Sequence, residues 1–588
     1  MERPISAMLA PVKRTSPSRW PRHLASLLWV LSATTPFFGA SAAESRTEAN
    51  VPVELAFSAQ RPHADPFHEV TLDLLFTAPN GARLKVPAFW AGGTTWKARY
   101  ASAVPGTHRW QSECTDQQDA GLHGVTGTIE VIPYRGENPL YRHGPLRVAA
   151  DRRHFAHADG TPFFWLGDTW WMGLTKRLAW PGDFHTLAAD RRAKGFNVVQ
   201  IVAGLYPDMP AFDERGANEA GFPWETNYAR LRPEYFNAAD RRIAYLAEQG
   251  FVPCIVGAWG YHLPWLGAEN LRRHWREIIA RWGAWPVVWC AAGETAMPFY
   301  LSKTKAADSE RQRREWTEIM RFIHATDPFG RLVTCHPSQT ARTSVTDPSV
   351  LDFDMQQTGH GSPARRHAAL ARQGWEAQPV MPVISGEARY EALEIKPTLT
   401  AREAREAFWA HLINSGCAGH TYGANGIWQV NRRGQPYGQS PGGNNWGTTP
   451  WDEAMRLPGS EQLGRAKRFL ESLPWSQFAP LPDTAAWAER QNEPSLGGQP
   501  AGNVGASDPL VTPYACGLGD RLRLVYALAP RAVSVQTLRA SARYRVTHFD
   551  PVTGGRAPAA SVLTGAKGEV RIEPPPHGHD WVLLLEAE

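Results

Sequence analysis

The segments "PVVWCAAGE" (residues 286–294) and "PVMPVISGEARYE" (379–391) share one pattern, an apolar run that meets a glycine and then a carboxylate. The carboxylates are Glu294 and Glu387. Short apolar runs bounded by turn residues are typical of the fully buried strands of a parallel sheet. Every strand has to end, and polar residues often end it, so one such carboxylate indicates little. Two of them at equivalent places indicate more than one does.

Six further strand-like runs occur between residues 163 and 423, and helical patterns separate most of the eight. The six are "FFWLGD" (163–168), "FNVVQIVAG" (196–204), "FVPCIVGAW" (251–259), "RLVTCHP" (331–337), "LDFDMQQ" (351–357) and "GCAGHTYG" (416–423). Eight units of strand followed by helix, over a few hundred residues, predict a (β/α)8 TIM barrel. A doubly wound open sheet is the alternative, but no glycine-rich phosphate loop follows the first strand.

The barrel pattern occupies residues 140–478 and has a β-rich region on each side. Residues 50–134 alternate short apolar and polar runs between glycine and proline turns, which predicts an antiparallel β-sandwich. Residues 480–588 end in further short strand-like runs and predict a second, smaller β-sandwich. The fold class expected is therefore multidomain α/β and all-β, with a central barrel between two β-sandwiches.

Residues 1–43 read as a secretory signal peptide. A basic segment precedes the apolar run "LASLLWVLSATTPFF" (24–38), and "GASAA" (39–43) supplies small residues for cleavage. The run is short and contains Pro36, so we expect a removed signal rather than a membrane span. The mature chain is expected to be exported, to the periplasm or the medium.

Composition and charge narrow the function. The formal net charge is +5, but residues 1–43 hold five basic and one acidic side chain, which leaves +1 for the mature chain. This argues against a nucleic-acid binder. The 25 tryptophans lean towards carbohydrate, because an indole face suits the C–H face of a sugar. No Cys or His cluster has zinc-ligand spacing, so we expect no metal and no cofactor. The oligomeric state stays open.

A TIM barrel gathers the carboxyl ends of its strands around one pocket, and catalytic residues come from those ends. The chain places acids, amides, imidazoles and aromatics there, without a nucleophilic Ser/His pair. The candidate site residues are Asp168, Gln200, Trp259, His262, Glu294, His336, Gln357, Glu387, Arg389, Tyr390, His420 and Tyr422, together with Trp428 and Trp446 from the long segment after the last strand.

Several of these candidates have an ordinary structural alternative. Asp168 either binds sugar hydroxyls or caps the loop that follows its strand. His336 and His420 either face the substrate or are structural histidines. Trp428 and Trp446 either form a wall for the sugar or anchor their glycine- and asparagine-rich loop.

The pair of acids is the more specific signal. Glu294 and Glu387 follow the fourth and seventh strands, so they face each other across the barrel mouth. Retaining glycosidases need two carboxyl groups about 5–5.5 Å apart, one protonated to donate to the leaving oxygen and one ionised to attack. Arg389, paired with Glu391, is expected to support Glu387 and to keep a neighbouring carboxylate ionised by lowering its pKa. The sequence thus predicts a glycoside hydrolase that acts on a carbohydrate substrate.

Five ordered motifs carry a family resemblance: "FFWLGDTWW" (163–171), "AKGFNVVQ" (193–200), "VVWCAAGE" (287–294), "ISGEARYE" (384–391) and "GHTYGANGIWQ" (419–429). Over residues 140–478 the chain resembles the apiosidase-like branch of TIM-barrel glycoside hydrolases, family 140. The flanking regions resemble a β-sandwich domain of unknown function and a β module of the collagen-binding type.

The resemblance implies that Glu294 is the general acid/base and Glu387 the nucleophile. The family more often has Asp at the first position, after two glycines, and "AAGE" (291–294) departs from this pattern, so apiose does not follow as the substrate. Two other classes remain open at this point. One is a glycan-binding protein that has lost turnover; the other is a collagen-binding protein, which only the name of the C-terminal module suggests.

Overall fold

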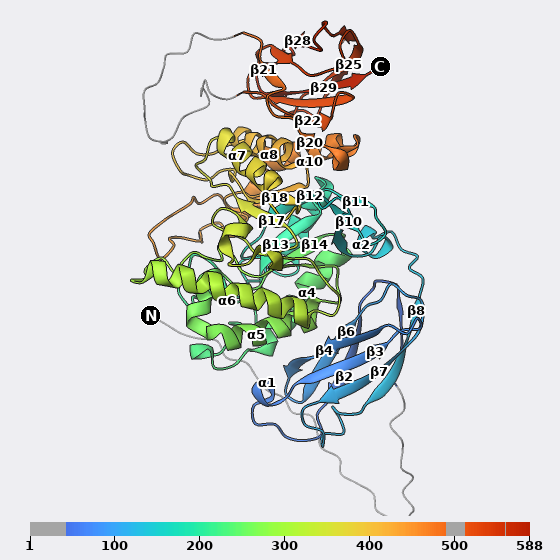
Figure 1. Ribbon diagram of the computed structural model, residues 1–588. Helices are drawn as coiled ribbons and strands as arrows, with labels where there is room; N and C mark the ends of the chain where they lie inside the picture. Colours follow the sequence, from blue (N-terminus) through green and yellow to red (C-terminus); the bar gives the residue numbers. More distant parts are fainter. Residues whose placement is uncertain (1–42, 490–511, 559) are drawn as a thin grey trace, which may run out of the picture. The chain divides into compact units, whose positions relative to one another are not determined.

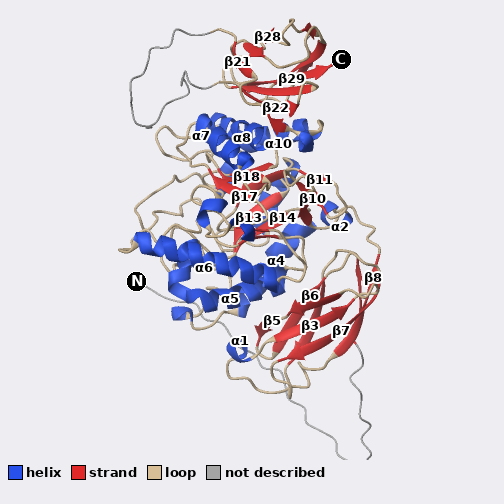
Figure 2. Ribbon diagram, in the orientation of Figure 1, coloured by secondary structure: helices blue, strands red, loops and turns tan. Residues whose placement is uncertain are grey.

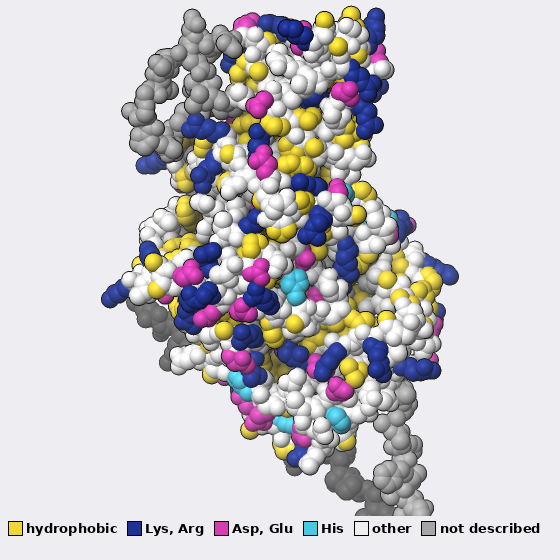
Figure 3. Space-filling model, in the orientation of Figure 1, with side chains coloured by type: hydrophobic (Ala, Val, Ile, Leu, Met, Phe, Trp, Pro, Cys, Tyr) yellow, Lys and Arg dark blue, Asp and Glu magenta, His cyan; other side chains and the backbone are white. Residues whose placement is uncertain are grey.

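The structure is a computed structural model that describes residues 43–489, 512–558 and 560–588 (Figure 1). The predicted signal peptide lies outside these ranges except for Ala43. None of the helices within the described ranges has the length and apolar character needed to cross a membrane. On the face drawn in Figure 3, basic and acidic side chains are interspersed, as expected of residues 44–588, whose formal net charge is +1.

The N-terminal region holds two sheets, as the alternating pattern of residues 50–134 predicts. One has the strand order β1-β8-β7-β3-β4 and the other β2-β6-β5. The strands are β1 (Ala43–Glu48), β2 (Val53–Ser58), β3 (Leu72–Thr77), β4 (Arg83–Pro87), β5 (Phe89–Gly92), β6 (Thr95–Tyr100), β7 (Gly106–Cys114) and β8 (Thr126–Ile132). One pairing differs from the antiparallel prediction, because β1 runs parallel to β8. The short helix α1 (Pro66–Glu69) lies between β2 and β3.

The centre of the chain is a TIM barrel of eight parallel strands, in the order β16-β15-β14-β13-β12-β19-β18-β17. All eight predicted runs form strands. They are β12 (Trp165–Thr169), β13 (Val198–Val202), β14 (Val252–Val256), β15 (Val288–Cys290), β16 (Val333–Thr334), β17 (Asp354–Gln357), β18 (Val383–Glu387) and β19 (Gly419–Tyr422). Their side chains are almost all buried, since helices cover the outside of the barrel and packed residues fill the inside.

Helices follow most of the strands, as the sequence pattern predicts; they are drawn in blue in Figure 2. They are α3 (Gly182–Ala193), α4 (Pro233–Glu248), α5 (Leu263–Trp282), α6 (Lys305–Thr326), α7 (Ala364–Glu376) and α8 (Ala401–Ser415), with α9 (Trp451–Ala454) and α10 (Pro458–Glu471) after the last strand. Between β16 and β17 only the 3-10 turns η4 (Ala341–Ser344) and η5 (Pro348–Val350) occur. Further 3-10 turns are η1 (Glu214–Gly216), η2 (Thr226–Tyr228), η3 (Gly260–His262) and η6 (Trp475–Gln477).

The barrel closes between β16 and β17 through hydrogen bonds beside the ladder. The backbone N–H of Asp352 donates to Val333 O at 2.8 Å, and the Thr334 hydroxyl donates to Phe353 O at 2.9 Å. The small sheet β11-β10-β9 precedes the first barrel strand. Its strands are β9 (Leu146–Val148), β10 (Phe155–His157) and β11 (Pro162–Phe163), and α2 (Pro139–Arg142) comes before them. The Phe155 ring packs edge-on against Phe353, at the amino ends of the strands and so opposite the predicted pocket.

The C-terminal region holds two further sheets. The larger has the strand order β20-β22-β23-β29-β25-β26, and β27 also pairs with β25; the second has the order β21-β24-β28. The strands are β20 (Ala479–Pro480), β21 (Ala485–Trp487), β22 (Tyr514–Leu518), β23 (Leu522–Ala527), β24 (Val533–Val535), β25 (Arg543–Phe549), β26 (Arg556–Pro558), β27 (Val562–Leu563), β28 (Val570–Ile572) and β29 (Trp581–Ala587). The larger sheet contacts the barrel helices: Trp409 of α8 stacks on Tyr526, and Phe469 of α10 stacks on Phe549.

Candidate active site

A cavity of about 230 Å³ opens at the carboxyl ends of the barrel strands, where a TIM barrel places its active site. Six of its fourteen lining residues are tryptophan or tyrosine, and carboxyl groups are its most numerous ionisable groups. The lining residues are Trp171, Pro207, Asp208, Trp259, Glu294, Met297, Tyr300, Gln357, His360, Glu387, Tyr390, Trp428, Asn444 and Trp446. An apolar wall with a few convergent polar groups is the usual composition of a small-molecule site.

Glu294 stands four residues beyond the end of β15, in a strained backbone position. Its φ of +40° is in the left-handed region, which residues other than glycine seldom adopt. The preceding Gly293 has no room for a side chain, because a Cβ there would lie 2.1 Å from the Trp259 ring. The Trp259 indole N–H donates to Glu294 Oε2 at 3.2 Å. Such strain persists where the surrounding structure holds a functional group in one orientation.

Glu387 is the last residue of β18 and therefore belongs to a rigid element. Gly386 before it is needed for close packing, because a Cβ there would lie 2.4 Å from Met355. The buried amide of Gln200, on β13, donates to Gly386 O at 2.9 Å across the barrel interior. Its place among the candidates implied contact with a sugar. Gln200 instead lies outside the cavity lining and fixes the backbone next to Glu387.

Gln357 connects the two acids. Its Nε2 amide lies 3.1 Å from Glu294 Oε1 and 2.8 Å from Glu387 Oε1 and donates to both. Because one nitrogen makes both contacts, these two carboxylate oxygens are at most the sum of the two lengths, about 6 Å, apart. The acids at the ends of β15 and β18 therefore share one small space.

Two imidazoles flank Glu387. His360 Nδ1 donates to Ala388 O at 2.7 Å, so this nitrogen carries the proton, since a carbonyl can only accept. Its Nε2 lies 3.2 Å from Glu387 Oε1, where a lone pair would face a carboxylate. The contact is favourable when His360 is an imidazolium. Burial alone would lower the pKa of His360, but the hydrogen bond to Glu387 and its charge outweigh burial, so the pKa of His360 is raised. His336 Nε2 lies 3.4 Å from Glu387 Oε2.

The two acids have opposite pKa shifts. Burial, followed by the charge of Glu387, raises the pKa of Glu294 to about 7. Burial would also raise the pKa of Glu387, but hydrogen bonding and charge from His336 and His360 outweigh it and hold that pKa well below its usual value. At neutral pH Glu387 is therefore ionised while Glu294 keeps a substantial protonated fraction. Two carboxyl groups with separated pKa values are the arrangement that acid and nucleophile roles need.

Asp208 is a third carboxyl group in the cavity. Burial raises its pKa to about 6, although the Tyr300 hydroxyl donates to Asp208 Oδ1 at 2.7 Å. Its backbone φ of +56° is again in the left-handed region. Within the lining, these three acids are accompanied by one histidine and by no lysine or arginine.

Seven of the fourteen predicted site residues line the cavity: Trp259, Glu294, Gln357, Glu387, Tyr390, Trp428 and Trp446. The Tyr390 hydroxyl donates to Glu387 Oε2 at 3.2 Å. His336 lies behind Glu387, fully buried, and its ring packs edge-on against Trp171. The other six are elsewhere.

Asp168 belongs to a closed ion pair in place of the predicted sugar contact. It is fully buried and meets the Arg191 guanidinium at 2.5 Å, while the Trp170 indole donates to the same oxygen. Its other oxygen accepts the backbone N–H of Thr169 at 3.0 Å. Both oxygens are thus satisfied within the protein, as a buried carboxylate requires.

His262, His420 and Tyr422 also lie outside the cavity lining. His262 Nε2 donates to Tyr206 O at 3.1 Å, and burial lowers the pKa of His262 to about 4. His420 is buried against Phe408 of α8, and burial holds its pKa well below the usual value, which agrees with the structural alternative for this residue.

The expected ion pair between Arg389 and Glu391 is absent. Arg389 instead pairs with Glu406 of α8 at 3.3 Å. Glu391 accepts the Tyr422 hydroxyl at 2.6 Å and the Gly459 N–H at 2.9 Å. The depressed pKa of Glu387 therefore has its cause in the imidazoles, not in Arg389 as predicted.

The lining also contains residues that the strand-end rule missed: Trp171, Pro207, Asp208, Met297, Tyr300, His360 and Asn444. His360 comes three residues after Gln357, in "QQTGHG" (356–361). A candidate list that continued three residues past the strand end would have included it. Asp208 lies in the longer loop after β13, where spacing from the strand gives no guide.

A barrel whose strand ends present two adjacent carboxyl groups with opposite pKa shifts defines a glycosidase-type active site. The family model described as "Apiosidase-like, catalytic domain" matches residues 149–477, more than half of the chain. The chain therefore belongs to the apiosidase-like family, and it is a glycoside hydrolase. A domain of unknown function, DUF5060, matches residues 48–115.

Solved structures agree on the fold. A family 5 glycoside hydrolase from Bacteroides vulgatus ATCC 8482 is 20% identical with a TM-score of 0.60, over 77% of this chain and 95% of its own. A protein described only as a glycoside hydrolase is also 20% identical with a TM-score of 0.60, over 77% and 98%. An inferred glycoside hydrolase from the same strain is 17% identical with a TM-score of 0.64, over 92% and 100%. No curated protein matched the sequence.

Proposed function

We propose that this chain is an exported, retaining glycoside hydrolase in which Glu294 is the general acid/base and Glu387 the nucleophile. The observation that carries the proposal is the Gln357 bridge, which keeps one oxygen of each acid within about 6 Å of the other. Retaining enzymes have their carboxyl groups about 5–5.5 Å apart, whereas inverting enzymes separate them by about 6.5–9.5 Å to admit a water. The pKa order supports the same roles, with Glu294 raised and Glu387 lowered.

The proposed reaction has two steps. First, the Glu294 carboxyl donates its proton to the glycosidic oxygen while Glu387 attacks the anomeric carbon, so that the C–O bond breaks and a glycosyl ester forms on Glu387. Second, the Glu294 carboxylate takes a proton from water as that water attacks the same carbon. The sugar leaves, Glu387 is again a carboxylate, and Glu294 is again protonated.

The cavity favours a neutral sugar. Its lining has three carboxyl groups and one histidine but no lysine or arginine, so a uronic acid or a sulfated sugar would be repelled. The aromatic wall, including Trp171, Trp428 and Trp446, suits the C–H faces of a sugar ring. The volume of about 230 Å³ is below the roughly 300–1,000 Å³ of drug-sized pockets. We propose that it takes one terminal sugar residue.

Export rests on the sequence of residues 1–43, whose basic segment, apolar run and small residues form a signal peptide pattern. Fractionation of the source cells, with an antibody against the mature chain, tests it. A mature N-terminus near Ala43 in the periplasm or the medium is the expected result, and a cytoplasmic chain that retains residues 1–43 would contradict it.

The test of the proposal is hydrolysis of a panel of aryl glycosides, with an apioside first because of the family description. For any substrate cleaved, proton NMR of the first-formed sugar should show the anomer of the substrate, because two inversions at one carbon give retention. Neutral glycosides should be preferred to the corresponding uronides. An inverted first product would rule out the nucleophile role of Glu387 while leaving the family assignment intact.

A further inference from the structure

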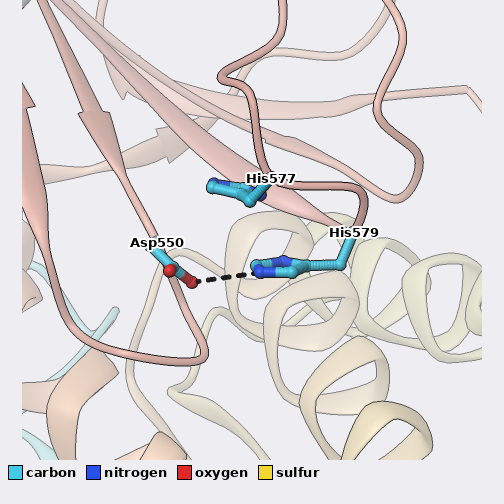
Figure 4. A group of neighbouring side chains, drawn as sticks. All are labelled: Asp550, His577 and His579. Carbon is cyan, nitrogen blue, oxygen red and sulfur yellow. Dashed lines mark ion pairs between the residues drawn. The ribbon is translucent and has the colours of Figure 1, made fainter.

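Three potential metal ligands meet in the C-terminal region, away from the barrel cavity. Asp550 follows β25, and His577 and His579 precede β29; one donor atom from each residue lies within 4.8 Å of the others (Figure 4). The two imidazole rings stack with centroids 3.9 Å apart, and His579 Nε2 lies 3.6 Å from Asp550 Oδ1. Two histidines and one carboxylate form a donor set that suits a transition-metal ion.

His579 is prepared to act as a ligand. Its Nδ1 donates to the backbone oxygen of Asp580 at 2.8 Å, so the proton is on Nδ1 and the lone pair is on Nε2, which faces Asp550. A hydrogen bond from the far ring nitrogen to a carbonyl is the usual support of a metal-bound histidine, because it fixes both tautomer and ring orientation.

Asp550 and His577 complete the set. The Asp550 carboxylate is oriented by the Val552 N–H at 2.8 Å and the Thr553 hydroxyl at 2.7 Å, both of which donate to it. His577 Nδ1 is buried and has no hydrogen-bond partner within the described residues, a costly state for a polar atom. A Cβ on Gly578, between the histidines, would meet no atom within 4 Å, so the backbone there is not packed against other residues.

We propose that Asp550, His577 and His579 bind one divalent transition-metal ion of the zinc class, with water completing a tetrahedral site. Zinc takes imidazole nitrogens at about 2.0–2.1 Å and carboxylate oxygens at about 2.0–2.2 Å, so the donors need only close around the ion by side-chain rotation. The sequence did not suggest this site, because its ligands come from two separate loops and "HGH" (577–579) alone is a weak pattern.

The position of the cluster gives the ion a structural role. Val552, in the same turn as Asp550, accepts a hydrogen bond from Arg465 of α10 at 2.6 Å. Asp580, next to His579, pairs with the buried Arg405 of α8. An ion here links the two loops of the larger C-terminal sheet that also contact the barrel helices, and it lies outside the active-site cavity. It should therefore stabilise this region without taking part in glycoside hydrolysis.

The experiment uses the untagged mature protein and Co²⁺ alone as a spectroscopic probe. After treatment with a chelator and its removal, titration with Co²⁺ should give visible absorption bands of a tetrahedral site that saturate at one ion per chain. Zn²⁺ should bleach these bands, and it should raise the melting temperature of the parent. The double variant His577→Ala/His579→Ala should bind at least about 100-fold more weakly and lose the Zn²⁺-dependent rise.

The matched control is His63→Ala/His68→Ala, which removes two histidines that also contact aspartates, Asp119 and Asp65, in the N-terminal region. It should bind like the parent. If the double variant folds poorly by circular dichroism, Asp550→Asn, which retains the side-chain shape, should still weaken binding at least about tenfold. The proposal would be overturned if the parent showed no saturable Co²⁺ binding. It would also be overturned if His577→Ala/His579→Ala and Asp550→Asn both bound Co²⁺ like the parent.

Discussion

The regions after β15 and at the end of β18 each present a glutamate to the same cavity, yet their surroundings shift the pKa of the two carboxyl groups in opposite directions. Around Glu294 the structure places the neutral donors of Trp259 and Gln357 and a strained backbone. Around Glu387 it places the same amide, the Tyr390 hydroxyl and two imidazoles. Burial raises the pKa of both carboxyl groups; the two imidazoles lower the pKa of Glu387, and the charge of Glu387 raises the pKa of Glu294 further.

This difference shows that chemical role depends on the loops that follow the strands as much as on the strands. A carboxyl group at a barrel strand end can serve as acid or as nucleophile, and the neighbours decide which. The imidazoles are contributed by the loops after β16 and β17, which lie between the two acids in the order of the barrel. Hydrogen bonds and charge from these two loops hold the pKa of Glu387 low, whereas at Glu294 the smaller effect of His336 does not overcome burial and the charge of Glu387.

The largest effect should come from Glu387→Gln. The amide keeps the shape of the side chain but cannot attack the anomeric carbon, so no glycosyl ester forms and turnover should fall by roughly 10⁴-fold or more. Substrate should still bind. Steady-state rates on an aryl glycoside and a tryptophan-fluorescence titration measure the two quantities.

Glu391→Gln is the matched control for that variant, since Glu391 is a buried carboxyl group four residues after Glu387, in the loop that follows β18, and lies outside the cavity lining. It should retain turnover within a few-fold after correction for folded protein. If Glu387→Gln kept near-full activity on a substrate that the parent cleaves, the mechanism would be wrong.

Glu294→Gln should have the second-largest effect, and its size should depend on the leaving group. Substrates with poor leaving groups need the proton and should lose about 10²–10⁴-fold in rate, whereas activated aryl glycosides should lose far less in the first step. In the parent, activity on poor leaving groups should fall as pH rises through about 7, because Glu294 then loses its proton. The variant should lack this alkaline limb.

Azide gives an independent check of Glu294. In Glu294→Ala the second step lacks its base, and a small anionic nucleophile needs none, so azide should restore part of the rate and yield a glycosyl azide. Azide should not raise the rate of Glu387→Gln in the same way. Rescue of both variants, or of neither, would remove the distinction between the two acids.

The sequence was sufficient for the barrel and for placing the two acids in its cavity, because both depend on local patterns. Apolar runs of strand length recur eight times, and each polar residue that ends a run is fixed at the mouth by the strand before it. The same logic identified Gln357 and Trp259. Strand-end position alone did not separate residues that face the cavity from those that face the helices, so Asp168, His420 and Tyr422 were included with them.

The electrostatics could not be predicted in the same way. Arg389 is two residues from Glu387 in sequence, yet its guanidinium contacts Glu406 on a covering helix. His360 is 27 residues from Glu387, yet its imidazole contacts the carboxylate. A pKa depends on distances through space, and loop conformation, which has no periodic signal, decides those distances. Asp208 and Tyr300 were missed for the same reason.

The third prediction removes one of the imidazoles that separate the two acids. His360→Gln takes a cation away from Glu387, so the pKa of Glu387 should rise towards its ordinary value. Since Glu387 has to be ionised to attack, the acid limb of the kcat/KM profile should move to higher pH by about one to three units. Activity near pH 6 should fall only modestly. His68→Gln, which changes an exposed histidine of α1, should leave the limb in place; an unmoved limb in His360→Gln would contradict the assigned cause.

The smallest effect concerns Asp208, which adds negative charge to the side of the cavity where Glu294 stays protonated. With a pKa of about 6, Asp208 is mostly ionised at pH 7, and its charge is one of the minor causes that raise the pKa of Glu294. In Asp208→Asn this repulsion is gone, so the pKa of Glu294 should fall and the alkaline limb should move to lower pH by a few tenths of a unit. The same variant should narrow the preference for neutral sugars over uronides, because one of three carboxyl groups no longer repels an anionic ring. The pH profile of kcat/KM on a substrate with a poor leaving group measures the first effect, and paired neutral and uronide substrates measure the second.

Asp65→Asn, which changes an aspartate of the N-terminal region beside His68, is the control and should change neither the limb nor the preference. A limb that moves to higher pH would mean that Asp208 lowers the pKa of Glu294, and the charge relation among the three acids would then have to be reversed.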